Sequence, residues 1–279
     1  MLFRSFTLSA GMTYMDSIIK RGLSVDDFAN QLSFQLHCNQ DIFEEAAKFR
    51  AARRMWAKIV KERYKPQNDK SMLFRVFSGG NGISFTAREP LNNIIRGAFQ
   101  CLTGALGGAQ AIHVPAYDEA FAIPTSESAL ISLRTQQITA FETGITNTVD
   151  PLAGSFYVEN LTNTLEEKAF ALMEEIERRG GMVACIKSGW IKSQVIDSAY
   201  KTQRDIDAGD KVIIGVNRFA KEAKEEEYKI EKPDPQILKN QIERLKDVKN
   251  KRDSSVVKES LKHRSEEHTS ELQSPNTIS

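Results

Sequence analysis

The sequence has no long apolar run. None of its 279 residues belong to a stretch approaching the roughly 18 consecutive apolar residues that a helix needs to span a bilayer. The first residues, Met1 to Arg4, also lack the apolar segment and cleavage site of a secretory signal peptide. These absences predict a cytoplasmic protein with no membrane segment.

Cysteine is scarce and irregularly placed. The three residues Cys38, Cys101 and Cys185 are far apart, and an odd number of distant cysteines is typical of reduced thiols rather than of a disulfide framework. None stands at metal-ligand spacing from a histidine, because the adjacent His37 and Cys38 point to opposite faces of any strand. We therefore predict neither a disulfide nor a metal site.

An excess of one charge is also missing. Thirty-eight basic and thirty-seven acidic residues give a formal net charge of +1, without the basic balance expected of a general nucleic-acid-binding protein. The content of 41% hydrophobic and 27% charged residues is that of a globular domain. The length suits one large domain or two ordinary ones.

Strand and helix patterns alternate three times in the first half of the chain. Each β-rich run is followed by an amphipathic segment, and the second of these is predicted to begin with a capping box, Thr86 with Glu89. The pairs of strand and helix are 30–38 with 40–62, 71–78 with 89–106, and 110–114 with 126–142. This alternation predicts an α/β fold with parallel strands and right-handed crossovers.

The helix predicted over 89–106 carries an apolar stripe that we expect to face the core. Its members are Ile94, Ile95, Ala98, Phe99, Leu102 and Leu106.

The first predicted strand alternates cleanly between apolar and polar residues. Leu32, Phe34, Leu36 and Cys38 fall on one face, and Gln31, Ser33, Gln35 and His37 fall on the other. A parallel strand covered on both faces is normally apolar throughout. The polar face therefore indicates either contact with water or a polar ligand, or an exposed edge strand, and the pattern does not choose between them.

The segment from Gly107 to Thr125 combines a strand, a break and a helix start. Pro115 ends the strand, and Thr125 is suited to cap the next helix, so Asp118 and Glu119 fall in a loop at the carboxyl end of a strand. Ligands bind at this edge of α/β sheets. The alternative is a surface loop with two solvated carboxylates.

The second half of the sequence has a different character. A turn-rich and then extended stretch over 150–157 precedes an amphipathic helix that stops at Gly180 and Gly181, a further helix is expected over 192–208, and a short strand over 211–216. From residue 220 the chain is rich in charge, as in a solvated helix or linker. Residues 264–279 resemble a translated sequencing adapter and are predicted to be a non-native tail.

Five motifs follow one another along the chain. They are Leu91-Asn92-Asn93-Ile94-Ile95-Arg96, Leu106 to Gln110 with His113, Asp118-Glu119-Ala120, Leu133-Arg134-Thr135-Gln136-Gln137, and Asp150 to Ser155. In this order they resemble one family, the large subunit of adenosylcobalamin-dependent acyl-CoA mutases of the methylmalonyl-CoA mutase type. The resemblance extends from about Gly22 to Asp253.

The resemblance implies a fold and a division of the chain. Residues 1–145 are expected to be the last three βα units of a (β/α)₈ TIM barrel, which threads the arm of the CoA substrate along its axis. Residues 146–263 are expected to form a mostly helical extension towards a cobalamin domain. The implied activity is a radical carbon-skeleton rearrangement of a branched acyl-CoA, and the chain is expected to be a fragment that is inactive alone.

The resemblance also implies binding residues. Ser33 and Gln31 lie where the family contacts the CoA substrate, while Gly82, Glu119 and Ala122 lie where it contacts adenosylcobalamin. Glu119 is expected to hold the adenosyl ribose through its hydroxyls. The catalytic residues of the family are expected upstream, outside this sequence.

Three residues depart from the family pattern. Gln31 replaces a usual arginine, Gly79 a usual glutamine, and Pro115 an asparagine close to the adenosyl group. These departures fit a mutase for another acyl-CoA, or a non-catalytic scaffold subunit of a heteromeric mutase.

The family's Asp-x-His-x-x-Gly motif for the cobalt-ligating histidine does not occur in this sequence. The cobalamin domain is therefore expected downstream or on a separate subunit, in a dimer or heteromer.

Overall fold

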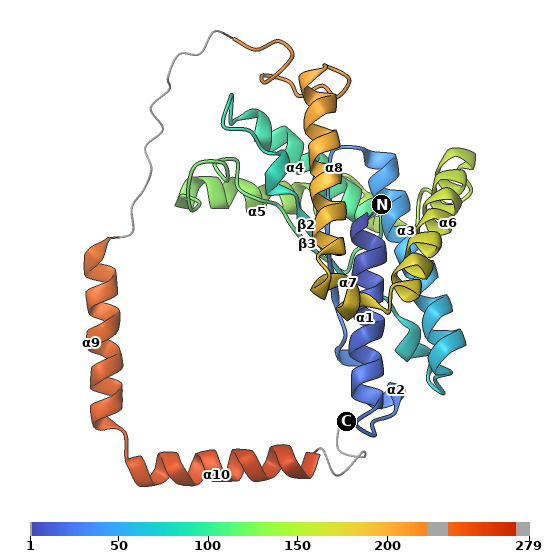
Figure 1. Cartoon of the computed structure of the whole chain (residues 1–279). Helices are drawn as coiled ribbons and strands as arrows, with labels where there is room; N and C mark the ends of the chain where they lie inside the picture. Colours follow the sequence, from blue (N-terminus) through green and yellow to red (C-terminus); the bar gives the residue numbers. More distant parts are fainter. Residues whose placement is uncertain (1, 222–233, 272–279) are drawn as a thin grey trace. The chain divides into compact units, whose positions relative to one another are not determined.

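The protein is described by a computed structural model that covers residues 2–221 and 234–271 (Figure 1). The chain forms two units, Met1–Lys229 and Ile230–Ser279. Within the described residues, the first unit contains a small sheet with helices around it, and the second contains two helices.

The sheet has three parallel strands in the order β1, β2, β3. These are β1 Phe34–Cys38, β2 Val76–Gly80 and β3 Ala111–His113. Residues His37, Gly79 and His113 are aligned across the three strands. The prediction of an α/β fold with parallel strands is confirmed.

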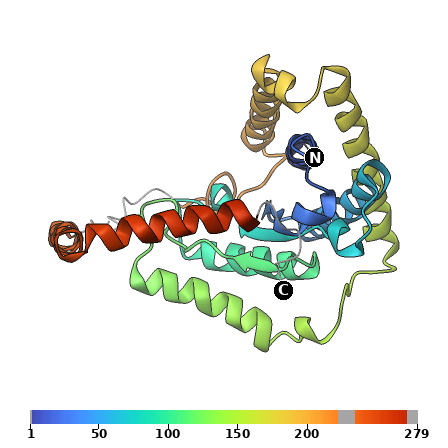
Figure 2. The same ribbon diagram turned by 90° about the horizontal axis from the view of Figure 1, so that it is seen from below.

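A helix follows each strand, as predicted. These helices are α3 Ile42–Ile59, α4 Asn92–Leu106 and α5 Ser126–Phe141, and α3 continues into a π-helical turn over Val60–Tyr64. Thr125 caps α5, because its side chain accepts a hydrogen bond from the backbone of Ser128. In Figure 2, α4 lies against the sheet and α5 packs on α4.

Two strands begin later than predicted. Residues Ala29–Gln31 form a 3₁₀ turn before β1, and Asp69–Met72 form another before β2. The second turn is held by tertiary contacts, since the Ser71 hydroxyl donates to Asp26 Oδ1 over 2.7 Å. A distant partner of this kind leaves no periodic signal in the sequence.

The predicted capping box of α4 is wrong. The Thr86 hydroxyl donates instead to the Arg88 carbonyl oxygen over 2.7 Å, and Glu89 has a left-handed backbone with φ of 49°. The helix therefore begins at Asn92, without a side-chain cap.

The apolar stripe of α4 does not face the sheet. Ile95 and Phe99 are exposed by 57% and 45%, whereas small and polar residues of the same helix are buried. The buried set comprises Asn93, Gly97, Gln100, Cys101, Thr103 and Gly104. The prediction for this stripe was wrong because glycines let the helix approach the sheet closely, and buried polar atoms find partners there.

The core lies between β1, α3 and a helix that the sequence patterns did not reveal, α1 Leu2–Ile19. Met12 and Met15 of α1 share this core with Phe34 and Trp56, whose rings meet edge to face at 4.8 Å between centroids. The stripe of Leu8, Met12 and Met15 lies among many other apolar residues of α1, so its amphipathic pattern is weak.

The remaining helices of the first unit are α2 Val25–Phe28, α6 Phe156–Arg178, α7 Met182–Lys187 and α8 Trp190–Asp207. Helix α6 packs on α1 and α3. Ser155 caps α6, so the segment expected to be extended up to residue 157 is already helical from Phe156. The short strand predicted over 211–216 is reduced to one bridge between Ile214 and Arg218.

The second unit contains α9 Pro235–Lys251 and α10 Ser254–Glu271. Every described side chain of α9 is exposed, in agreement with a solvated helix. The proposed tail over 264–279 begins within α10, and its last part lies outside the described residues. Within residues 2–221 and 234–271, no helix is long and apolar enough to cross a membrane.

Candidate functional site

Gly82 and Glu119 meet at the carboxyl edge of the sheet. Gly82 opens a 3₁₀ turn directly after β2, and Glu119 lies in the loop after β3. A Cβ atom at position 82 would stand 2.9 Å from Glu119 Cγ and 3.1 Å from Oε1. The structure thus brings together two of the predicted site residues, and the missing side chain at Gly82 makes room for the glutamate.

The loop that carries Glu119 is held by its neighbour Asp118. Asp118 Oδ2 accepts a hydrogen bond from the Thr125 backbone over 3.3 Å, and its carbonyl oxygen accepts one from Ala122 N over 3.3 Å. This arrangement places Ala122, half-buried, in the same short loop as Glu119. The structure therefore gives Asp118 a positioning role, whereas Glu119 is exposed and its carboxylate has no hydrogen bond or ion pair within the described part of the chain.

A buried amide supports the turn that carries Gly82. Gln100 of α4 is 1% exposed, its Oε1 accepts from Asn81 N over 3.0 Å, and its Nε2 donates to Ser84 Oγ over 2.7 Å. The Asn81 side chain donates in turn to Asn39 Oδ1, which follows β1. Gln100 was not predicted from the sequence. Its position on α4, opposite the apolar stripe, is the feature that could have indicated it.

One face of the sheet is open, and it carries polar side chains. This open face consists of Gln35 and His37 from β1, Phe77 and Gly79 from β2, and Ala111 and His113 from β3. In β1 the burial alternates, with Phe34, Leu36 and Cys38 buried. The predicted alternation is confirmed, and β1 is also an outer strand of the described sheet, so both interpretations of its polar face remain compatible with the structure.

The imidazole of His37 lies over Gly79. His37 Nδ1 is 3.3 Å from the Gly80 carbonyl oxygen, and it would be 3.0 Å from a Cβ atom at Gly79. On the other side of β2, the His113 ring is 6.5 Å from the Phe77 ring between centroids. His37 was not predicted to be a site residue, yet it lies on the same face as His113.

The residues predicted to bind the CoA substrate lie elsewhere. Ser33 directly precedes β1 and Gln31 belongs to the 3₁₀ turn before it, and both are exposed. They occupy the amino end of β1, whereas Gly82 and Glu119 occupy the carboxyl edge of the sheet. The predicted residues therefore form two groups separated by the length of a five-residue strand, on the order of 16 Å.

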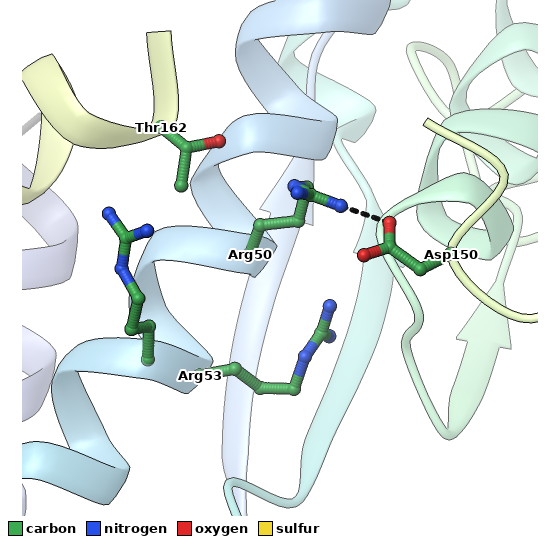
Figure 3. Close-up of a pocket in the computed structure, with 5 residues that line it drawn as sticks. Arg50, Arg53, Asp150 and Thr162 are labelled. Atoms are coloured by element: carbon green, nitrogen blue, oxygen red, sulfur yellow. Dashed lines mark hydrogen bonds and ion pairs between the residues drawn. The ribbon is translucent and has the colours of Figure 1, made fainter. Parts of the chain in front are cut away.

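A second polar cluster joins the helices away from this face (Figure 3). A pocket of about 310 Å³ is lined by Arg50, Arg53, Arg54, Asp150 and Thr162. Arg50 forms ion pairs with Asp150 and Glu159, and Arg53 Nη1 donates to the Gly107 carbonyl oxygen over 2.7 Å.

The arginines of this cluster serve the fold. They attach the Asp150 turn and α6 to α3, and Arg53 reaches a free carbonyl at the end of α4. Burial lowers the pKa of Arg53 from its usual value, and Asp150 opposes that effect.

Comparison with known proteins provides an independent assignment. The family model described as methylmalonyl-CoA mutase matches residues 4–277. The 2-hydroxyisobutanoyl-CoA mutase large subunit of Aquincola tertiaricarbonis is 42% identical over 257 residues, which are 92% of this chain and 46% of that protein. The methylmalonyl-CoA mutase of Rhizobium meliloti is 40% identical over 257 residues, covering 92% of this chain and 36% of the relative.

A third relative is named as a subunit. The methylmalonyl-CoA mutase large subunit of Porphyromonas gingivalis is 40% identical over 257 residues, again 92% of this chain and 36% of the relative. The chain thus spans less than half the length of these curated relatives. The extent of the family match, together with the ordered motifs, shows that the chain belongs to the methylmalonyl-CoA mutase family.

Proposed function

We propose that this chain is part of a cobalamin-dependent isomerase that rearranges the carbon skeleton of a branched acyl-CoA. The single observation that carries the proposal is the pairing of Gly82 with Glu119 at the carboxyl edge of a parallel sheet, in a chain of this family. The edge is where α/β folds bind ligands, and the carboxylate is exposed there with no protein partner in the described part of the chain.

The residues present fit an adenosyl group. The Glu119 carboxylate can accept hydrogen bonds from both hydroxyls of a ribose, and Asp118 keeps its loop in place. Gly82 keeps that carboxylate accessible, because a side chain there would displace it. Ala122, in the same loop as Glu119, is the third residue proposed to contact adenosylcobalamin. Adenosylcobalamin, when bound, supplies the radical that takes a hydrogen atom from the substrate.

We assign the CoA end of the substrate to the opposite edge of the sheet. Ser33 and Gln31 are exposed and polar at the amino end of β1, so they can donate hydrogen bonds to the CoA arm. A barrel completed by further βα units would enclose the open face, and its polar side chains would then line the path of the arm.

The proposed enzyme also needs a cobalamin-binding part. The relatives named as large subunits support a heteromer, although a domain on the same chain satisfies the same requirement. We place the enzyme in the cytoplasm and the cobalamin domain downstream or on a partner subunit. Alone, this chain is proposed to be inactive.

A scaffold subunit without activity is the second candidate. It is favoured by Gln31, Gly79 and Pro115, which replace residues that the family usually places near its ligands. Pro115 is buried, and its Cδ would lie 2.3 Å from a Cβ atom at Gly80. This position is thus filled by packing and presents no side-chain hydrogen-bond donor.

The test uses the full-length protein together with its cobalamin partner. We expect rearrangement of at least one member of a panel of branched acyl-CoA thioesters. Glu119→Ala should weaken adenosylcobalamin binding, measured by absorbance titration, about tenfold or more, because charge-assisted hydrogen bonds are lost. Glu127→Ala, which removes an exposed carboxylate of α5, is the matched control and should leave cofactor affinity unchanged.

Two results would count against this function. Absence of rearrangement across the whole panel, with cofactor bound, would favour the scaffold subunit. Equal cofactor affinity of the Glu119 and Glu127 variants would remove Glu119 from the cofactor site.

A further inference from the structure

A histidine lies on the open face of the sheet with one ring nitrogen committed and the other available. His37 is exposed and is the fourth residue of β1, in register with Gly79 and His113. Its backbone is held on the outer side of the strand, because Lys48 Nζ donates to the His37 carbonyl oxygen.

The contact of Nδ1 determines the hydrogen-bonding character of the ring. Nδ1 faces the Gly80 carbonyl oxygen at 3.3 Å, and a carbonyl oxygen can only accept, so Nδ1 is the donor. In a neutral imidazole the other nitrogen, Nε2, then carries a lone pair and acts as an acceptor. Nε2 has no hydrogen-bond partner among the described residues.

Glycine at position 79 is required for this placement. A Cβ atom there would lie 3.0 Å from His37 Nδ1 and 3.2 Å from Cε1, so a larger side chain would push the imidazole away. The Gln35 amide nitrogen lies on the same side, 3.5 Å from that Cβ position. Gly79 and His37 therefore depend on each other. Position 79 of β2 has no side chain, and the His37 imidazole from the neighbouring strand occupies the space that a side chain would take.

His37 and Gly79 lie near the edge of the sheet where the proposed function places the reacting part of the substrate. Gly80 is followed by Asn81 and by Gly82, which meets Glu119, so His37 lies near the carboxyl edge. Ser33 is four residues away along the chain, or about 13 Å in an extended strand. In the proposed function, Glu119 holds the adenosyl group and Ser33 contacts the CoA arm, and His37 is located towards the acyl group.

We propose that His37 Nε2 accepts a hydrogen bond from a hydroxyl group on the acyl chain, and that His37 with Gly79 selects hydroxyacyl-CoA over carboxyacyl-CoA substrates. The inference rests on the proposed function. A hydroxyl supplies the proton that the acceptor needs, whereas a carboxylate offers only lone pairs to it. A site built to hydrogen-bond a hydroxyl also discriminates against the analogue that lacks it.

The experiment compares three substrates on the full-length protein with its cobalamin partner. The probes are 2-hydroxyisobutanoyl-CoA, methylmalonyl-CoA and isobutanoyl-CoA, and both equilibrium binding and steady-state turnover are measured. We expect the unmodified protein to prefer the hydroxyacyl thioester. His37→Phe should lower its kcat/KM about tenfold, mainly through KM, and leave isobutanoyl-CoA within about twofold.

Gly79→Gln provides a second route to the same effect. Its side chain should displace the imidazole and reduce hydroxyacyl selectivity as His37→Phe does. Because both changes remove the same interaction, the double variant should lose no more hydroxyacyl selectivity than either single variant. His37 is exposed whereas Gly79 is buried, so circular dichroism melting of each variant is used to select those that retain the fold.

Several outcomes would overturn the inference. They are a preference of the unmodified protein for methylmalonyl-CoA, an equal loss for all three substrates in His37→Phe, or fully additive losses in the double variant. Binding without turnover separates the two proposals, because selective hydroxyacyl binding that depends on His37 supports the site while the mutase activity fails. No binding of any thioester would overturn both.

Discussion

The surroundings of Cys38 determine the protonation state of its thiol. It is the last residue of β1, it is fully buried, and its sulfur lies 3.3 Å from Ser78 Oγ. Burial raises the pKa of the Cys38 thiol from 9.0 to about 11, and the hydrogen bond with Ser78 only partly offsets the effect. The folded state therefore favours the neutral thiol, and this residue is not a nucleophile at neutral pH.

This shift predicts a loss of stability in alkali. Because the folded pKa is the higher one, the contribution is complete below about pH 9 and disappears as the pH rises towards 11. Two pKa units correspond to about 3 kcal/mol at most. Urea unfolding of the protein and of Cys38→Ala, at pH 8 and at pH 10.5, measures this contribution to the free energy of unfolding. Other groups that titrate at high pH are present in both proteins and cancel in the difference. A constant difference between the two proteins would contradict the assignment.

At the scale of elements, α4 lies close to the sheet because of its glycines. A Cβ atom at Gly104 would lie 2.8 Å from Ser78 Oγ, and one at Gly97 would lie 2.8 Å from Val114 Cγ1. The buried face of the helix is therefore formed by small and polar residues. The larger apolar residues Ile95 and Phe99 point away from the sheet.

Gly104→Ala should destabilise the protein although alanine is the better helix former. Helix propensity favours the change by about 1 kcal/mol, but overpacking against Ser78 costs about 1–3 kcal/mol. We expect a lower melting temperature in a thermal scan. In a Ser78→Ala background the same change should be less destabilising, because the nearest atom, Ser78 Oγ, has been removed and only the Cβ atom at 3.2 Å remains. A rise in melting temperature of the single variant would show that the helix can shift at little cost.

At the scale of the whole molecule, apolar side chains remain uncovered on α4 and α5. Ile95 and Phe99 of α4 and Leu130, Leu133 and Phe141 of α5 are all at least 45% exposed. The two helices pack on each other, and large exposed apolar areas on a protein mark interaction surfaces. Strands β1 and β3 also have unpaired edges within the described residues.

The isolated chain of this sequence should therefore self-associate. Light scattering is expected to show a mass that grows with concentration in the micromolar range, because burial of these faces is favourable. Ile95→Gln with Phe99→Ser should reduce the association, whereas Val149→Ser, at a single exposed position outside these helices, should not. A monomer that melts cooperatively would contradict this expectation.

Local patterns predicted several features of the fold correctly. The period-two alternation around Leu36 placed β1 and its buried face, and Thr125 marked the start of α5. Predictions from local patterns were wrong where a residue distant in the sequence determines the local structure. Ser71 entered a 3₁₀ turn through Asp26, and the stripe of α4 was turned away from the sheet.

The candidate site was predictable only in part. The family motifs pointed to Gly82, Glu119 and Ala122, and the structure places the first two in contact. Gln100 and His37 were missed, because their roles depend on atoms of other elements, Asn81 for the first and Gly79 and Gly80 for the second. A single sequence without its neighbours in space does not show such contacts.

The sequence by itself determined the α/β class, the parallel strands and the family, because these depend on hydrophobic periodicity and on the order of motifs along the chain. The tertiary structure alone decided which face of α4 is buried and that Gly82 meets Glu119. It also decided which nitrogen of His37 is free. The physical reason is that packing and hydrogen bonding join residues far apart in sequence, and the partners become defined only when strands align in register.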